Sequence, residues 1–297
     1  MRISLCYPDW IHQTFHRSGK VGTLTYDNCP DESSDYVVTF GNLPDPLPSW
    51  WSAIPRARRI AVLPENPKIY WPKKNYFDQH EFVITPAAWN QDELSNKWIF
   101  THAGNQWFYG VKYRTDTGLS HVPIIENPPP DLSWHIERHA PKKTKLLSVV
   151  FSGKNGLIGH QLRQSLIPAL RSKFSDRDID IYGFGNRPIT DKAQAIDGYH
   201  YHLVIENDFL GNYVTEKICD AYLGFAEPIY IGAPNIQNFF DEEVMSIIPV
   251  SVDQCVFEIE KIVSRPPNLK NVSLNRFNVL LKLNFYYHLS SIIKKDM

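Results

Sequence analysis

Short apolar segments, several of them bounded by turn residues, recur along this 297-residue chain and constrain its fold more than any other feature. The segments lie at residues 2–7, 35–40, 58–63, 81–85, 145–151, 178–182, 201–206 and 228–231. Stretches with helical periodicity separate some of them, most clearly residues 158–174 and 213–224. Strands that alternate with helices predict parallel sheets that are covered on both faces. The sequence therefore predicts an α/β protein.

The pattern lapses between residues 127 and 145, where three consecutive prolines end at Pro130 and the segment HAPKKTK follows. Such a stretch is typical of a domain linker. A chain of 297 residues is also too long for one ordinary core and suits two domains. We therefore expect an N-terminal α/β domain over residues 1–135 and a C-terminal α/β domain over residues 136–272.

Residues 273–297 are expected to form a C-terminal helix that packs on the two domains. Apolar side chains recur on roughly one face of this segment, from Leu274 to Ile292. The second interpretation left open is a weak helix at a membrane surface, given the basic residues Arg276, Lys282, Lys294 and Lys295. Weak peripheral membrane association is therefore a further expectation.

Composition excludes several classes of protein. Hydrophobic residues make up 43% of the chain, as in a folded globular protein, and the net charge of -1 argues against a general nucleic-acid binder. No apolar run approaches the roughly 20 residues that span a bilayer, and the first residues lack the sustained apolar stretch of a signal peptide. The four cysteines form no CxxC pair, so neither a zinc site nor a disulfide framework is indicated. We expect a cytoplasmic protein.

The segment IENDFLGNYVTEK, residues 205–217, places charged groups where an apolar strand ends and a helix begins. Glu206 follows the strand residues HLVI, and open α/β sheets bind ligands beyond the carboxyl ends of their strands. Glu216 and Lys217 fall in the first turn of the expected helix, where free N–H groups and the helix dipole favour phosphate. Carboxylates, in turn, accept hydrogen bonds from sugar hydroxyls. The segment indicates a nucleotide-sugar site, and the alternative is a helix-start carboxylate beside a solvated lysine.

The same segment, with ICDAYLGFAEPIYIGAPNI after it, resembles the signature of the family 10 glycosyltransferases, the α-1,3/1,4-fucosyltransferases. The segments SGKNGLIGHQLR, DIYG and DKAQAIDGYHYHLVIE extend the resemblance upstream, so that it covers roughly residues 147–249. In the N-terminal half the resemblance is weak and rests mainly on LPENP, residues 63–67.

This resemblance implies two Rossmann-like domains of the GT-B type that face each other across a cleft, with GDP-fucose held by the C-terminal domain. Lys217 and Arg163 would contact the diphosphate, and Glu216 would accept hydrogen bonds from the ribose. The planar guanidinium of Arg163 also suits phosphate oxygens on physical grounds alone. The matching positions that would line the donor pocket are Glu206, Asn207 and Tyr213.

The activity implied is inverting transfer of fucose from GDP-fucose to a surface glycan such as a lipopolysaccharide O-chain. Two alternatives stay open: the same scaffold with a different nucleotide-sugar donor, and a nucleotide-sugar-binding protein without transferase activity.

Transfer with inversion needs a general base for the acceptor hydroxyl, and Glu65 is the candidate. Glu65 follows the strand expected at residues 58–63, and Pro64 and Pro67 stiffen its loop. The resemblance implies the same role, because the family has a glutamate in an E-x-P-type segment at a comparable place. The alternative for Glu65 is a solvated loop carboxylate.

A rival motif, D-x-D, occurs between Asp176 and Asp180, and in another glycosyltransferase architecture this motif binds a divalent cation. Here Asp178 and Asp180 flank the start of a strand, opposite to the edge where ligands bind. We therefore expect no required metal and no cofactor besides the donor substrate. His160, close to Arg163 on the same expected helix, is a further candidate for contact with the donor.

Aromatic residues are frequent in the N-terminal half and are candidates either for a sugar-stacking platform or, for most of them, for core packing. They are Trp10, Trp50, Trp51, Tyr70, Trp71 and Tyr76.

Overall fold

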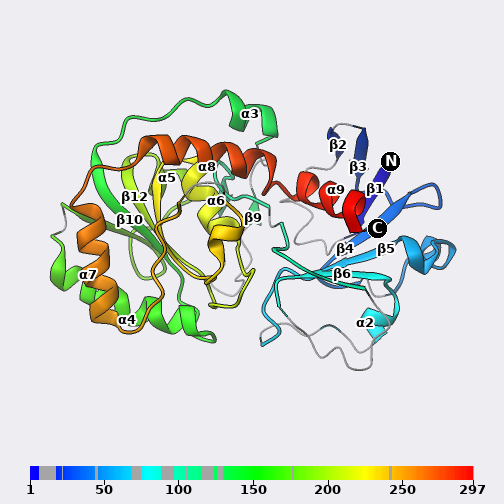
Figure 1. The fold of residues 1–297 in the computed structure, drawn as a ribbon, viewed down its shortest axis with the longest axis horizontal. Helices are drawn as coiled ribbons and strands as arrows, with labels where there is room; N and C mark the ends of the chain where they lie inside the picture. The colour runs from blue at the N-terminus through cyan, green and yellow to red at the C-terminus, as the bar shows by residue number, and fades with distance from the viewer. Residues whose placement is uncertain are drawn as a thin grey trace. The chain divides into compact units, whose positions relative to one another are not determined.

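The computed structural model describes residues 1–6, 18–21, 23–43, 46–68, 72, 75–87, 97–104, 106–114, 124–125, 130–175, 177–240 and 243–296. The chain divides into two compact units, one of residues 1–106 and 284–297 and one of residues 107–283 (Figure 1). Each unit contains its own sheet of mainly parallel strands. The predicted α/β class is therefore confirmed. Four residues named above lie outside the described part of the chain: Trp10, Tyr70, Trp71 and Asp176.

The first unit contains a seven-stranded sheet with the order β2-β3-β1-β4-β5-β6-β7, in which only β2 and β3 pair antiparallel. Its strands are β1 (Arg2–Cys6), β2 (Ser18–Val21), β3 (Leu24–Asp27), β4 (Tyr36–Phe40), β5 (Arg59–Val62), β6 (Phe82–Thr85) and β7 (Lys97–Phe100). The sequence predicts β1, β4, β5 and β6 to within one residue at each end. It misses β2, β3 and β7; the side chains of β3 and β7 are largely exposed or half-buried and form no apolar run.

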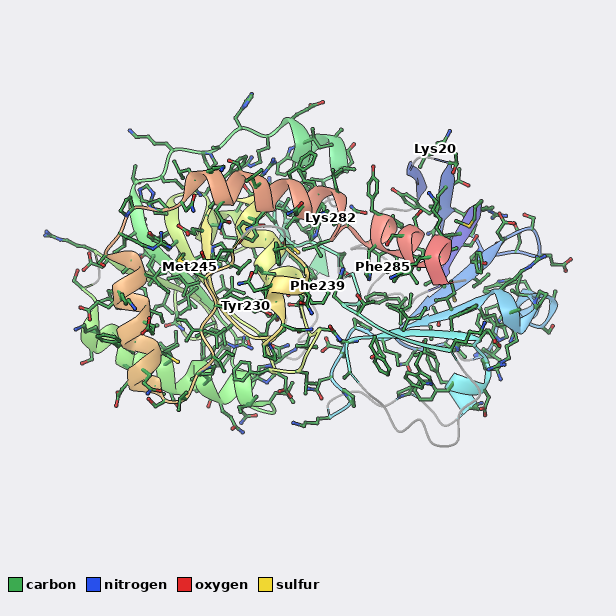
Figure 2. The ribbon with its side chains drawn as sticks, viewed as in Figure 1. Lys20, Tyr230, Phe239, Met245, Lys282 and Phe285 are labelled. Atoms are coloured by element: carbon green, nitrogen blue, oxygen red, sulfur yellow. The ribbon has the colours of Figure 1, made fainter. Side chains whose placement is uncertain are left out.

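Side chains along β5 alternate between the two faces of this sheet. Ile60 and Val62 belong to a cluster with the apolar face of α9 (Phe285–Asp296), on which Figure 2 labels Phe285. Ala61 points the other way and packs with residues of α2 (Asn75–Asp78). The first sheet is therefore covered on both faces, as predicted for a parallel sheet.

Two of the candidate platform aromatics are core residues of the first unit. Trp51, in the short 3-10 helix η1 (Ser49–Ala53), is buried, and its indole N–H donates to the Gln79 side chain at 3.1 Å. Tyr76 is buried too, and its hydroxyl forms a hydrogen bond of 2.9 Å with Thr39. Core packing is therefore confirmed for these two residues.

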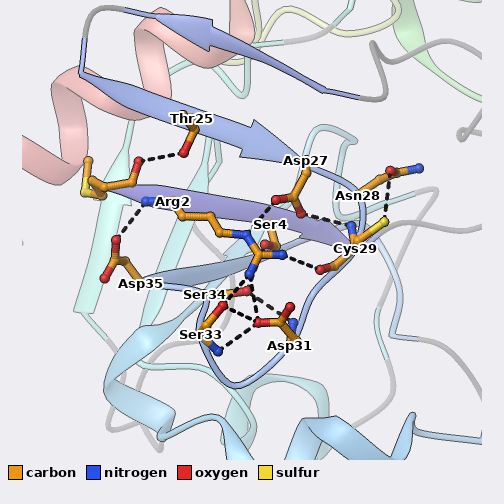
Figure 3. A network of polar contacts seen from close by, with 11 residues as sticks. Arg2, Ser4, Thr25, Asp27, Asn28, Cys29, Asp31, Ser33, Ser34 and Asp35 are labelled. Carbon is orange, nitrogen blue, oxygen red and sulfur yellow. Dashed lines mark hydrogen bonds and ion pairs between the residues drawn. The ribbon is translucent and has the colours of Figure 1, made fainter.

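A network of polar contacts around Arg2 holds the connection between β3 and β4 (Figure 3). The Arg2 guanidinium pairs with Asp27 at 2.7 Å and with Asp31 at 2.8 Å, and it donates to the carbonyl oxygen of Cys29 at 2.7 Å. The backbone N–H of Arg2 donates to Asp35 at 2.7 Å. Through its side chain and its backbone N–H, Arg2 thus joins β1 to both ends of this connection.

The second unit contains a fully parallel sheet with the order β11-β10-β12-β13. Its strands are β10 (Lys145–Phe151), β11 (Ile179–Gly183), β12 (Tyr199–Ile205) and β13 (Glu227–Ile231), all of which the sequence predicts. A separate pair, β8 (Tyr113–Arg114) and β9 (Ile124–Ile125), is antiparallel. The remaining elements of the two units are η2 (Arg56–Arg58), α3 (Leu132–Glu137), α5 (Ala193–Ile196) and η3 (Ile236–Asn238).

Long helices cover both faces of the second sheet (Figure 1). Leu203 of β12 packs with α4 (Ile158–Lys173) and α7 (Val252–Val263). The next residue, Val204, packs with α6 (Glu216–Leu223) and α8 (Leu269–Leu281) on the opposite face. Helix α4 is predicted almost to the residue. Helix α6 begins at Glu216, three residues after the predicted start at Tyr213.

The segment 131–144, predicted to be part of a linker, belongs to the second unit. Asp131 caps α3 by accepting the N–H of Trp134 at 2.8 Å, and Arg138 pairs with Asp197 at 2.5 Å. The two units divide between residues 106 and 107, which is upstream of the predicted boundary after residue 135.

The prediction of one continuous C-terminal helix is wrong. Helix α8 ends at Leu281, and Asn284 then accepts the backbone N–H of Tyr286 at 3.0 Å, which stabilises the start of α9. Helix α8 belongs to the second unit and α9 to the first. No helix in the described part of the chain is both long and apolar enough to cross a bilayer.

Candidate functional site

The carboxylate of Glu206 links the end of β12 to the start of α6. Its side chain is completely buried. Oε1 accepts the backbone N–H of Thr215 at 2.9 Å, and Oε2 accepts the Thr215 hydroxyl at 2.7 Å and Nζ of Lys217 at 3.3 Å. Both carboxylate oxygens therefore have partners within the protein, and the geometry is that of a group that fixes the helix start.

Thr215 is the N-cap of α6, because its hydroxyl oxygen also accepts the backbone N–H of Lys217 at 3.5 Å. Glu216 and Lys217 accordingly occupy the first helical turn, as the sequence predicts. Sequence analysis missed the role of Thr215, although a threonine directly before an acidic first turn is a recognised helix-start signal.

Lys217 is a cation that the protein itself surrounds with acceptors. Its Nζ lies 2.9 Å from the Thr215 hydroxyl, 3.3 Å from Glu206 and 3.4 Å from Glu216. Burial lowers the pKa of Lys217, but the two carboxylates raise it by more, so the net shift is upward. The structure shows that two carboxylates stabilise its charge.

Glu216 lies between two lysines, with Oε1 3.4 Å from Nζ of Lys217 and 3.7 Å from Nζ of Lys192. Burial opposes ionisation of Glu216, but the two ammonium groups lower its pKa to about 2. Lys192 also pairs with buried Asp220 at 2.5 Å, and Asp220 accepts the backbone N–H groups of Phe108 and Tyr109. Lys192 and Asp220 extend the site, and sequence analysis identified neither.

Arg163 comes from the first turns of α4 and is almost fully buried. Its guanidinium donates to the Gly159 carbonyl at 3.2 Å, to the Ser152 hydroxyl at 3.1 Å and to Oδ1 of Asn207 at 2.5 Å. The structure therefore brings the predicted residues Arg163 and Asn207 into direct contact, although 44 positions separate them in the chain.

Gly159 allows α4 to approach the end of β12 closely. A Cβ atom at this position would lie 1.9 Å from the carbonyl oxygen of Glu206, which no side chain tolerates. The N–H of Gly159 donates to the Asn207 carbonyl at 3.0 Å. Because α4 starts against the residues that follow β12, Arg163 reaches the same strand end as Lys217.

Gly232, which follows β13, likewise allows a close approach, in this case of the side chains of Tyr230 and Glu206. A Cβ atom there would lie 2.4 Å from Oη of Tyr230, which Figure 2 labels, and 2.6 Å from Cγ of Glu206. Tyr213, a predicted donor-pocket residue, is 1% exposed. Glu206 and Tyr213 are thus buried supports of the site in this structure.

Glu65 belongs to the first unit. It lies shortly after the end of β5, at the carboxyl edge of the first sheet, and it is half-buried. Its neighbour Asn66 is fully buried, and the Asn66 side chain accepts the backbone N–H of Lys68 at 2.7 Å. The position of Glu65 beyond a strand end is confirmed, and its role as a base stays a prediction.

The structure describes two carboxylates of the D-x-D segment, those of Asp178 and Asp180. Both have partners within the protein near the start of β11. Asp178 accepts the Ser175 hydroxyl at 2.6 Å. Asp180 pairs with Lys145 at 2.6 Å and with Arg187 at 2.8 Å. Within the described ranges, no group of three or more His, Cys, Asp and Glu side chains is arranged to hold a metal ion. Metal independence stays a prediction.

Known proteins resemble this chain in fold and, over part of its length, in sequence. Profiles of known protein families do not match this chain. A fucosyltransferase-like protein of Arabidopsis thaliana is 29% identical over 102 residues, which is 33% of this chain and only 19% of that protein's length. This similarity in sequence covers about a third of the chain.

Among the solved structures that match, three α1,3-fucosyltransferase structures are superposed over the whole chain. A crystal structure of an α1,3-fucosyltransferase superposes with a TM-score of 0.51 at 19% identity, over 100% of this chain and 90% of the other. A structure of α1,3-fucosyltransferase with GDP gives 0.51 and 19%, over 100% of this chain and 91% of that one. A structure with GDP-fucose gives 0.50 and 18%, again over 100% of this chain and 91% of that one. The chain thus has the two-sheet α/β fold of these α1,3-fucosyltransferase structures.

Proposed function

We propose that this protein is an inverting glycosyltransferase that binds GDP-fucose in its second unit and transfers fucose to a glycan hydroxyl. One observation carries the proposal: α4 and α6 both start at the carboxyl end of β12, and each brings a largely buried cation there, Arg163 and Lys217. Two helix starts with two cations suit a diphosphate. The fold of the α1,3-fucosyltransferases solved with GDP and GDP-fucose supports the same conclusion.

In this proposal, Arg163 and Lys217 stabilise the charge that develops on the leaving diphosphate. Nζ of Lys217 has three hydrogens and already has three acceptors, so a phosphate oxygen would replace the longest contact, that with Glu216 at 3.4 Å. Glu216, ionised at neutral pH, then accepts from the ribose hydroxyls. Glu206 acts mainly by positioning Thr215 and Lys217, since it has no exposed surface.

Glu65 is assigned as the general base that takes the proton of the acceptor hydroxyl. The acceptor class, a surface glycan such as a lipopolysaccharide O-chain, stays a prediction from the sequence. The same holds for the cytoplasmic location and for weak peripheral membrane association.

The choice of donor is tested by thermal shift with GDP-fucose, GDP-mannose and UDP-galactose. A donor at about 100 times its Kd stabilises the protein by roughly 2.7 kcal/mol. We expect the largest shift with GDP-fucose, and a screen of glycan acceptors with linkage analysis should then give a fucosylated product. A larger shift with UDP-galactose would indicate another donor. Binding of GDP-fucose without transfer to any acceptor would indicate a nucleotide-sugar-binding protein.

Lys217→Ala and Arg163→Ala should each weaken GDP binding by about 10- to 100-fold, because each removes a charge-assisted hydrogen bond worth about 1.5–3 kcal/mol. Isothermal titration calorimetry with GDP measures the effect. The matched control is Lys145→Ala, since Lys145 pairs with Asp180 at the start of β10, away from the ligand edge. If both test variants bind GDP as tightly as the parent, the phosphate assignment is wrong.

Transfer activity should change less than about twofold when EDTA is added, because Arg163 and Lys217 supply positive charge that a divalent cation would otherwise provide. Activity is measured before and after chelation, with manganese and magnesium added back. Complete loss with EDTA and recovery with either ion would favour a metal-dependent mechanism.

A further inference from the structure

His160 lies in the first turn of α4 and is 3% exposed. Its Nδ1 accepts the backbone N–H of Leu157 at 3.2 Å, a contact that fixes the orientation of the ring. A neutral imidazole has one acceptor and one donor nitrogen. Because Nδ1 is the acceptor, Nε2 carries the hydrogen and faces away from Leu157.

The surroundings of His160 keep the imidazole neutral. Burial lowers its pKa to about 4, with smaller contributions in the same direction from Arg163, Lys154 and Lys217. The Asn207 side chain opposes this shift in part. At physiological pH His160 is therefore an uncharged hydrogen-bond donor close to three cations.

The N–H at Nε2 is buried and has no hydrogen-bond partner among the residues that the structure describes. A buried donor of this kind destabilises the protein when nothing accepts from it. The Asn207 side chain interacts with the imidazole ring, but its oxygen already accepts from Arg163 at 2.5 Å, and Nε2 makes no hydrogen bond of normal geometry within the described residues. An acceptor supplied by a ligand would remove this cost, and the three cations favour an anionic oxygen.

We infer that His160 donates a hydrogen bond from Nε2 to a phosphate oxygen of the bound nucleotide and so recognises the diphosphate together with Arg163 and Lys217. The inference rests on the proposed function for the identity of the nucleotide. A neutral donor suits this position because a further cation would be repelled by Arg163. A neutral N–H can still direct a hydrogen bond toward the phosphate oxygen. The contact with Leu157 holds this donor in place before the ligand binds.

His160→Phe keeps the ring volume and removes the donor. We expect its Kd for GDP, and for inorganic pyrophosphate, to rise about 10- to 100-fold. Its Kd for guanosine, which has no phosphate, should change less than about twofold. His160→Gln retains an N–H donor and should recover much of the lost affinity. In the parent protein, pyrophosphate should move the ¹⁵N and ¹H NMR signals of the His160 Nε2–H group downfield, a test that requires no variant.

The results separate this inference from the proposed function. If the parent binds GDP and transfers fucose while His160→Phe binds GDP equally well, the inference is wrong and the function stands. If the parent binds pyrophosphate but not GDP, and His160→Phe loses pyrophosphate, the function is wrong and the anion contact stands. An equal loss of GDP and guanosine affinity, or an unchanged Nε2 signal, would mean that His160 only maintains the structure and would overturn the inference.

Discussion

Glu65→Gln is expected to lower kcat by about 10²–10⁴-fold, which is the range of a general base acting in the transition state. The substitution keeps the size of the side chain and removes its ability to accept a proton. Affinity for GDP should stay within about twofold of the parent, because Glu65 belongs to the first unit and the proposed donor-binding residues belong to the second. Steady-state kinetics and calorimetry with GDP measure the two effects separately.

Two other carboxylates of the first unit serve as matched controls for Glu65. Glu81 directly precedes β6, at the amino end of a parallel strand, and pairs with Arg56 at 2.7 Å. Asp78 ends α2 and is exposed. Glu81→Gln and Asp78→Asn should retain most of the parent kcat, since neither lies at the carboxyl edge of the sheet. A near-normal kcat for Glu65→Gln would show that the base is another group.

The predictable part of the fold is the part that is buried on both faces. The strands β10, β12 and β13 read as apolar runs because their side chains pack against helices on either side of the sheet. β7 gives no such signal, since its outer residues Lys97 and Phe100 are exposed. The break between α8 and α9 was missed because apolar side chains recur at helical spacing through both helices, and the capping role of Asn284 is visible only in the structure.

The predictable part of the site is the part that is local in sequence. One strand-to-helix turn contains Glu206, Glu216 and Lys217, so the sequence alone shows how their charges are spaced. The contacts of Lys192 with Glu216 and Asp220 join segments that are distant in the chain, and single-residue patterns carry no information on such pairs. The close approach at Gly159 likewise depends on where α4 meets β12.

Acidification should destabilise this protein, because several buried histidines are neutral in the folded state, among them His80, His102 and His202. His80 forms a 2.8 Å hydrogen bond with the Thr39 hydroxyl and donates to the Tyr76 carbonyl. Burial lowers the pKa of His80 to about 3, and it does the same for His202. Burial also places the pKa of His102 well below its usual value.

An unfolded histidine has a pKa of about 6.5, so below that pH the unfolded chain binds protons that the folded chain excludes. Above pH 6.5 the histidines are neutral in both states and do not lower the free energy of unfolding. That free energy falls as the pH drops from 6.5 toward the folded-state pKa of about 3 for His80 and His202. In this pH range each histidine lowers the free energy of unfolding by about 1.4 kcal/mol per pH unit. The three together lower it by about 4 kcal/mol per pH unit if both structural units unfold in one transition. A total stability of about 5–15 kcal/mol would be exhausted within a few pH units.

Urea unfolding between pH 7.5 and 5 tests this effect above the range in which Glu216, with a folded pKa of about 2, loses its contribution, which begins below its usual value of 4.5. The free energy of unfolding should fall steeply below pH 6.5. His80→Gln should be less stable at pH 7.5, owing to its altered hydrogen bonds, and should show a slope that is smaller by about 1.4 kcal/mol per pH unit. His139→Gln is the control, since His139 is exposed and its loss should leave the slope unchanged. A free energy that stays constant from pH 7.5 to 5 would contradict the assignment, because it requires these histidines to bind protons equally well in the folded and unfolded protein.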